Sequence, residues 1–177
     1  MREIEIKMSV SDLNSIKSQL EKMGCVFNDP IVQKDIIFRR DGEAPNVRNI
    51  LRIRSVNNKN LFTLKRNVND ELDCLEKETE ISNPDELRDI IELLGYKEFV
   101  RINKRRSICH YKDYEVCLDD VENLGYFVEM EKLEEVSNEG AEDIRKEMIE
   151  FLESLGIDKN NRVRSGYDTL MEQNKVV

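Results

Sequence analysis

The sequence predicts an α+β fold in which strands with one charged and one apolar face form a strongly curved sheet or barrel, with helices on the apolar side. Three acidic repeats, each within a segment that alternates like a β-strand, give the first indication: Glu3-Ile4-Glu5, Glu78-Thr79-Glu80 and Glu129-Met130-Glu131. Alternation places both carboxylates of a repeat on one face of its strand. The second indication is a helix-like stretch after each repeat, which ends at Gly24, Gly95 or Gly156.

The predicted strands follow the alternation of apolar with charged or polar residues. In chain order they cover residues 2–8, 31–40, 50–56, 61–66, 75–81, 100–111, 114–118 and 126–133. Where the alternation is clear, one face is apolar: Leu51 and Ile53, for example, lie opposite Arg52 and Arg54. The segment Asn57-Asn58-Lys59-Asn60 is predicted to be a hairpin turn, and residues 41–49 and 67–73 are predicted loops.

Three helices are predicted from apolar residues at helical spacing. The first has Ser11 as its N-cap and carries Leu13, Ile16, Leu20 and Met23 at helical spacing. The second begins at Ser82-Asn83-Pro84, with proline in its first turn, and the third covers residues 139–155. The pattern assigns no further element to the tail.

Composition limits the classes of function. The 177 residues suit one domain with its own core, so a single domain over residues 1–177 is expected. The net charge of −9 argues against nonspecific binding to nucleic acid and to anionic membranes. No apolar signal core or membrane-spanning stretch is evident, which predicts a cytoplasmic protein. The four cysteines and the single His110 lack metal-ligand spacing, so reduced and mostly buried cysteines are expected instead of a zinc site.

The charged strand faces carry two sets of side chains. The acids are Glu3, Glu5, Glu78, Glu80, Glu129 and Glu131, with Asp119 nearby, and the bases are Lys7, Arg52, Arg54, Lys65, Lys104 and Arg106. Because the apolar faces pack beneath helices, the charged faces should line the inner surface of a curved sheet or barrel. Burial of so many charges is unfavourable unless ions and a ligand complete the site.

Carboxylate pairs without histidine or cysteine partners favour Mg²⁺ or Mn²⁺. Arginines and lysines that face the same cavity favour a chain of phosphates. Metal ions beside basic residues are the recurring arrangement for phosphoryl and nucleotidyl transfer. The alternative is a lattice of cross-strand salt bridges on a solvated face, which is typical of an isolated Glu-x-Glu repeat. Three such repeats with Arg-x-Arg and Lys-x-Arg favour a binding site.

The motifs also occur in a definite order: Glu3-Ile4-Glu5-Ile6-Lys7, Gln33-x-Asp35-x-x-Phe38, Leu51-Arg52-Ile53-Arg54, Thr63-Leu64-Lys65, Glu78-x-Glu80, Lys104-x-Arg106 and Leu118-Asp119-x-Val121-x-x-Leu124-Gly125-x-Phe127-x-Glu129-x-Glu131. This ordered set resembles the CYTH superfamily, the triphosphate tunnel metalloenzymes, over about residues 1–170. Residues 119–125 and 165–170 look most like class IV adenylate cyclases and their close relatives. Two positions depart from the family pattern. Glu76 stands where arginine often precedes the middle repeat, with Lys77 as a substitute, and Gly166 looks inserted.

The resemblance implies an eight-stranded antiparallel β-barrel that forms a tunnel, with helices packed on its outside, often in a homodimer. It implies Mg²⁺ or Mn²⁺ on the glutamates, for which the candidate ligands are Glu3, Glu5, Glu80, Glu129 and Glu131. A triphosphate such as ATP would bind Lys7, Arg52, Arg54, Lys65, Lys104 and Arg106. The candidate catalytic residues are Lys7, Lys65, Arg106 and Asp119.

The leading hypothesis is a class IV adenylate cyclase, in which the ribose 3′-hydroxyl of ATP attacks the α-phosphorus and pyrophosphate leaves. One alternative is a triphosphatase that hydrolyses thiamine triphosphate, inorganic triphosphate or nucleoside triphosphates. Another is a non-catalytic sensor of a triphosphate or nucleotide, which the full set of metal ligands disfavours. Cyclase and triphosphatase need the same phosphate ligands, so the motifs do not separate them.

Overall fold

The computed structural model describes residues 2–42, 49–67 and 72–174. It confirms the predicted fold class, an α+β eight-stranded antiparallel β-barrel with helices, and adds the two-residue strand β9 (Arg162–Val163). The chain divides into two compact units, Met1–Pro30 with Arg105–Arg164 and Ile31–Lys104 with Ser165–Val177. The long strand β6 (Lys97–Tyr111) contributes one part to each unit. The single domain over residues 1–177 stays a prediction.

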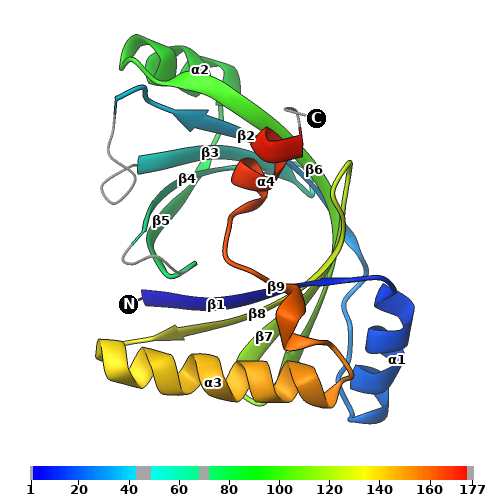
Figure 1. Cartoon of the computed structure of the whole chain (residues 1–177). Coiled ribbons are helices and arrows are strands. Elements are labelled where there is room, and N and C mark those ends of the chain that lie inside the picture. The colour runs from blue at the N-terminus through cyan, green and yellow to red at the C-terminus, as the bar shows by residue number, and fades with distance from the viewer. Residues whose placement is uncertain (1, 43–48, 68–71, 175–177) are drawn as a thin grey trace. The chain divides into compact units, whose positions relative to one another are not determined.

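The first unit is a sheet with the strand order β6-β7-β8-β1-β9 (Figure 1). Its elements are β1 (Arg2–Val10), α1 (Leu13–Lys22), β7 (Tyr114–Val121), β8 (Gly125–Glu134), α3 (Asn138–Ser154) and a 3₁₀ turn (Lys159–Asn161) before β9. Helices α1 and α3 pack on the apolar face, where Ile4, Ile6 and Met8 of β1 are fully buried. The predicted two faces of β1 are therefore confirmed.

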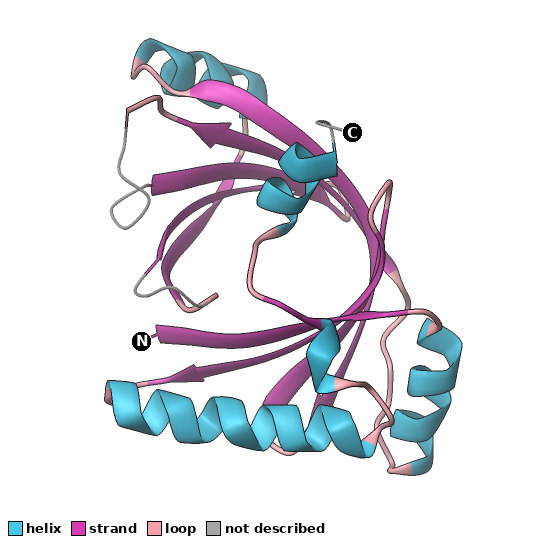
Figure 2. Cartoon of the chain, viewed as in Figure 1, coloured by secondary structure: helices cyan, strands magenta, loops and turns pink. Residues whose placement is uncertain are grey.

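The second unit has the strand order β5-β4-β3-β2-β6. Figure 2, in the same view as Figure 1, distinguishes the strands (magenta) from the helices (cyan). The elements of this unit are β2 (Ile31–Arg39), β3 (Asn49–Val56), β4 (Lys59–Asn67), β5 (Cys74–Ile81), α2 (Pro84–Leu93) and α4 (Tyr167–Asn174). Leu51 and Ile53 pack with Phe38 and with Ile91 of α2. This packing leaves the alternate residues of β3, Arg52 and Arg54, on the other face.

The hairpin between β3 and β4 has the predicted turn. Val56 pairs with Lys59, and the two residues between them, Asn57 and Asn58, have φ angles of 49° and 62°. Two successive left-handed residues are typical of a type I′ turn, and asparagine tolerates this conformation better than most residues. Most of the predicted loops at residues 41–49 and 67–73 lies outside the described residues.

The helix ends show one error of prediction. Asp12, not Ser11, is the N-cap of α1, and its carboxylate accepts from the backbone N–H groups of Asn14 at 2.9 Å and Ser15 at 3.3 Å. A charged acceptor at this end is also stabilised by the helix dipole, which favours it over the neighbouring hydroxyl. Among the described residues, no helix has the length and apolar character that a membrane crossing needs.

The tail, to which the sequence pattern assigns no element, contains β9 and α4. Arg39 of β2 holds α4: an Nη atom donates to Asp168 Oδ2 at 2.5 Å and to Thr169 Oγ1 at 3.0 Å. The guanidinium also stacks on Phe99, 3.8 Å from the ring centroid. A Cβ at Gly166 would lie 2.4 Å from Asp168 Oδ1, so the inserted-looking glycine leaves room for the buried carboxylate.

We expect Asp168→Ala to loosen α4 and to lower the free energy of unfolding by about 3 kcal/mol, because it leaves Arg39 buried without its main partner. Urea unfolding and hydrogen exchange of the α4 amides measure the two effects. Glu172→Ala is the matched control, since Glu172 is exposed and lies 3.6 Å from Arg39. Equal losses in both variants would show that the buried pair has no special role.

Candidate functional site

A row of carboxylates crosses three strands of the first unit. Glu5 of β1 lies directly opposite Glu131 of β8, and Glu131 in turn lies opposite Glu115 of β7. All three lie on the face opposite the helices, as the alternation of each strand requires. Like charges placed opposite each other on neighbouring strands destabilise a sheet unless a cation offsets them. The row is therefore a place where positive charge is needed.

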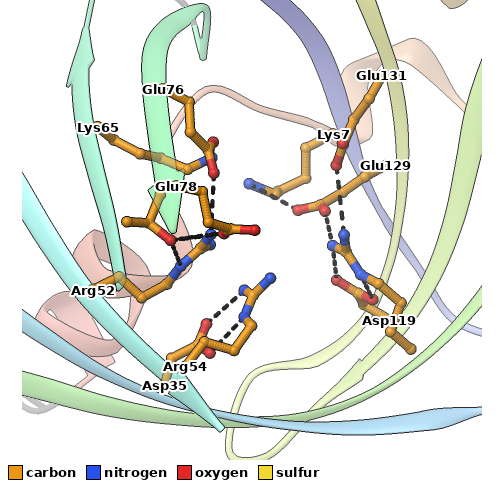
Figure 3. A network of polar contacts seen from close by, with 12 residues as sticks. Lys7, Asp35, Arg52, Arg54, Lys65, Glu76, Glu78, Asp119, Glu129 and Glu131 are labelled. Carbon is orange, nitrogen blue, oxygen red and sulfur yellow. Dashed lines mark hydrogen bonds and ion pairs between the residues drawn. The ribbon is translucent and has the colours of Figure 1, made fainter. Parts of the chain in front are cut away.

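Lys7 supplies part of that charge. Its ammonium lies 3.0 Å from Glu5 Oε1. It also lies 3.1 Å from Glu129 Oε1, a contact that Figure 3 shows. Burial would lower the pKa of Lys7, but the charges of Glu5 and Glu129 outweigh it and raise the pKa above its ordinary value. Lys7 thus remains an ammonium ion at neutral pH, and it acts as a fixed positive charge that donates hydrogen bonds.

Arg106, on the later part of β6, is bound by three acids (Figure 3). Its Nε and an Nη atom donate to the two oxygens of Asp119, at 2.7 Å and 2.6 Å, and the same Nη donates to Glu129. The other Nη lies 3.5 Å from Glu131 Oε1. Burial opposes the charge of Arg106, but Glu129 and Asp119 raise its pKa. The two-point contact with Asp119 fixes the plane of the guanidinium.

Glu131 shows that the acids exceed the cations. Burial, followed by the charges of Glu129, Glu3 and Glu5, raises the pKa of Glu131 to about 8, although Arg106 acts in the opposite direction. The carboxyl group therefore retains a proton near neutral pH when no further cation is present. Carboxylate oxygens are the ligands that Mg²⁺ and Mn²⁺ prefer, and a divalent ion would offset the same repulsion. The residues present thus fit a divalent cation.

In the second unit, Arg54 forms a two-point ion pair on the charged face. Its Nε and an Nη atom each donate to one oxygen of Asp35 at 2.7 Å (Figure 3). The two residues lie directly opposite each other on β3 and β2. Burial would raise the pKa of Asp35, but Arg54, with help from Arg52 and Lys104, lowers it. Asp35 is thus an ionised residue that orients Arg54 much as Asp119 orients Arg106.

Arg52 and Lys65 share carboxylates of β5. One Nη of Arg52 donates to Thr63 Oγ1 at 3.0 Å, to Glu76 Oε1 at 3.2 Å and to Glu78 Oε2 at 3.3 Å. The Lys65 ammonium lies 2.6 Å from the other oxygen of Glu76. Lys65 and Arg52 are therefore linked through one carboxylate, and Thr63 completes the network by donating to Glu78 at 2.8 Å.

Lys104 lies on the earlier part of β6 and is buried. Its ammonium is 5.0 Å from the centroid of the Tyr167 ring at the start of α4, a distance at which the ring face attracts a cation. Because α4 is held by Arg39, the tail takes part in positioning this base. The sequence pattern pointed to Tyr167 only through the motif at residues 165–170.

The structure brings most of the predicted residues together within their own units. In the first unit these are Glu5, Lys7, Arg106, Asp119, Glu129 and Glu131, and in the second they are Arg52, Arg54, Lys65 and Lys104. Glu3 is half-buried on β1 and adds to the repulsion on Glu131. Glu80 has a different environment: its side chain is 58% exposed and pairs with Lys59 at 2.9 Å, beside the hairpin.

Sequence reasoning named Asp35 and Thr63 only as motif positions and Glu76 only as a departure from the family pattern, and it gave no role to Glu115 or Cys117. Asp35, Thr63 and Glu76 contact the bases, and Glu115 and Cys117 continue the charged face on β7. The alternation of β5 places Glu76 on the same face as Glu78 and Glu80, but the sequence analysis assigned only the acids at residues 78 and 80 to the charged face. Lys77 is exposed on the face opposite Glu76, so it does not substitute for a base at that position.

The four cysteines are free and buried, as predicted. Burial raises the pKa of the Cys109 thiol to about 12, and the neighbouring His110 is exposed. Adjacent residues of a strand point to opposite faces, so Cys109 and His110 form no nucleophilic pair.

Comparisons with known proteins agree with the fold and the motif order. The protein-family model described as "CYTH domain" matches residues 1–167. A protein of Methanocaldococcus jannaschii, "Putative adenylate cyclase MJ0240", is 36% identical over 170 residues, which cover 94% of this chain and 97% of that protein. The structure of the PH1012 protein from Pyrococcus horikoshii has a TM-score of 0.81 at 27% identity and covers 95% of this chain and 98% of its own.

HpAC1 from Hippeastrum is a more distant structural neighbour, described as a "putative adenylyl cyclase" with a dominant triphosphatase activity. Its TM-score is 0.62 at 18% identity, with 93% of this chain and 90% of that chain covered. At this identity the likeness concerns the fold.

We expect the metal-free protein to lose stability through Glu131 as the pH rises. The folded state holds the Glu131 proton more tightly than the unfolded chain, so this contribution is full below the ordinary pKa of 4.5 and is lost as the pH approaches 8. Glu131→Gln keeps the neutral form at every pH. Urea unfolding in EDTA should therefore show a gain in the variant, relative to the wild type, of at most about 4 kcal/mol between about pH 5 and pH 8.5.

Glu21→Gln, at an exposed position on α1, is the control for the loss of one acid. A stability difference between Glu131→Gln and the wild type that stays constant with pH would contradict the raised pKa.

Proposed function

The chain belongs to the CYTH domain family, and on this premise we propose that it converts ATP to cyclic AMP and pyrophosphate with the help of a divalent cation. The observation that carries the proposal is the row of opposed carboxylates with Lys7 and Arg106 beside it. Such a row needs a cation, and the chemistry of nucleotidyl transfer uses one. The name of the 36% identical relative, "Putative adenylate cyclase MJ0240", supports the choice of reaction.

Glu5, Glu129 and Glu131 are the proposed ligands of Mg²⁺ or Mn²⁺, with Glu3 and Glu80 next. The bound ion would supply positive charge that withdraws electrons from the phosphate oxygens. Lys7 lies between Glu5 and Glu129 and remains protonated, so its role is to donate hydrogen bonds to phosphate rather than to remove a proton. Asp119 is a positioning residue, because both of its oxygens already bind Arg106.

The triphosphate is proposed to bind six basic residues: Lys7, Arg52, Arg54, Lys65, Lys104 and Arg106. Arg54 and Arg106 are held by two-point contacts with Asp35 and Asp119, so their donors are oriented before the substrate arrives. Groups that are oriented in advance stabilise developing charge without reorganising during the reaction. The pyrophosphate that leaves would be stabilised by these cations while the 3′-oxygen bonds to the α-phosphorus.

A triphosphatase is the second candidate. HpAC1 shares the fold and is described as having a dominant triphosphatase activity. The same cation ligands and bases would serve attack by water on the terminal phosphorus. The two reactions differ in the nucleophile and in the phosphorus atom attacked, and these differences can be measured directly.

We expect ATP with Mg²⁺ or Mn²⁺ to yield cyclic AMP and pyrophosphate, identified by chromatography. 3′-Deoxy-ATP should bind with similar affinity but fail to react, because it lacks the nucleophile and retains the triphosphate. A triphosphatase would release orthophosphate from both nucleotides at similar rates. That result, without a cyclic product, would exclude the cyclase and leave the triphosphate as substrate.

We expect Glu5→Gln and Glu131→Gln each to weaken binding of Mn²⁺ about tenfold or more, because an amide keeps the shape of the side chain but loses its charge. Electron paramagnetic resonance of free Mn²⁺ measures this without reference to activity. Glu21→Gln, on the exposed face of α1, should bind as the wild type does. Unchanged Mn²⁺ affinity in both site variants would refute the assignment of these ligands.

A further inference from the structure

Glu76 of β5 contacts Arg52 and Lys65, two of the bases that the proposed function assigns to the triphosphate. Its Oε1 accepts from an Nη of Arg52 at 3.2 Å, and its Oε2 lies 2.6 Å from the Lys65 ammonium (Figure 3). The side chain of Glu76 is 19% exposed, so water screens these contacts only in part. Both oxygens of one carboxylate are thus engaged by two cations.

The contacts of Glu76 are of the kind that a phosphate would make. Guanidinium and ammonium groups bind carboxylate and phosphate oxygens in the same way, through charge-assisted N–H donors. The Nη of Arg52 that faces Glu76 is already shared with Thr63 and Glu78. A phosphate that approaches the Arg52 and Lys65 donors facing Glu76 therefore competes with this carboxylate for them.

Competition has an electrostatic consequence. A phosphate that replaces Glu76 on the two bases lies next to a carboxylate that has lost its partners. In a partly buried site this repulsion is stronger than in water. A triphosphate complexed with a divalent ion carries less net negative charge than the free anion, so it is repelled less. The displaced carboxylate is also an oxygen ligand of the type that such an ion accepts.

We propose that Glu76 is a specificity-determining residue: an internal anionic ligand of Arg52 and Lys65 that makes the site select the metal complex of a triphosphate over the free anion. The inference rests on the proposed function, because it takes Arg52 and Lys65 to be phosphate ligands. It assigns Glu76 an effect opposite to that of the bases, since removing its charge strengthens the binding of the free anion.

Isothermal titration of the full chain with inorganic tripolyphosphate tests the proposal, once in EDTA and once in excess Mg²⁺. In EDTA, Glu76→Gln should bind about tenfold tighter than the wild type, because the repulsion and the competition are removed. The factor by which Mg²⁺ strengthens binding should fall correspondingly. Glu86→Gln, at an exposed position of α2, is the control for the loss of one acid and should match the wild type in both conditions.

Glu76→Gln leaves Arg52 and Lys65 with fewer partners and could impair folding. A second variant therefore tests whether the change in binding comes from the loss of charge. Glu76→Thr removes the same charge with a residue that suits a strand, and it should show the same tighter binding in EDTA. Thermal unfolding without ligand reports whether each variant is folded. A lower melting temperature without ligand, together with a larger rise on adding tripolyphosphate, agrees with the proposal.

Two results would overturn it in distinguishable ways. If the wild type binds tripolyphosphate and the Glu76 variants bind no tighter in EDTA, Glu76 has only a structural role and the proposed function stands. If neither the wild type nor the variants bind in either condition, Arg52 and Lys65 are not phosphate ligands, and the inference fails with the proposed function.

Discussion

Most of the described cations on the charged strand faces contact carboxylates of the same sheet. Arg106 with Asp119 and Arg54 with Asp35 are the clearest cases, and Lys7 and Lys65 follow the same rule. Apolar residues of several strands, such as Ile6 of β1 and Ile53 of β3, belong to the cores, so the charged residues that alternate with them lie on the other face. On that face the cations and the carboxylates offset one another's charge.

The balance between acids and cations differs from place to place on the charged faces, and the places where it differs are candidates for ligand binding. Around Glu131 the acids exceed the cations, so its carboxyl group retains a proton near neutral pH. Around Arg52 the cations are covered by Glu76 and Glu78, so the bases are satisfied by the protein itself before any ligand binds. A protein that needed only stability would gain by replacing such groups with apolar residues of similar size. Their presence fits a role in binding charged ligands.

The sequence could predict which residues of a strand share a face, because successive side chains alternate between two faces. The apolar residues identify the face that packs in the core. Lys7 and Arg52 were placed correctly on this basis. The choice between Ser11 and Asp12 as N-cap could not be made, since both are good acceptors in adjacent positions. The roles of Asp35 and Glu76 depend on the register between strands, and that of Asp168 on a contact 129 residues away in the chain. Patterns within a short stretch of sequence do not reveal contacts between residues that are far apart in the chain.

The contact between Arg39 and Asp168 makes the effects of substitutions at positions 39, 166 and 168 depend on one another. The carboxylate lies so close to Gly166 that a side chain there would have to move it, and without the carboxylate Arg39 loses its main partner. Substitutions at 39, 166 and 168 are therefore not independent, and a single change at any of them is penalised while a combined change need not be. Related sequences should covary at these positions, with glycine at 166 kept wherever the acid at 168 is kept.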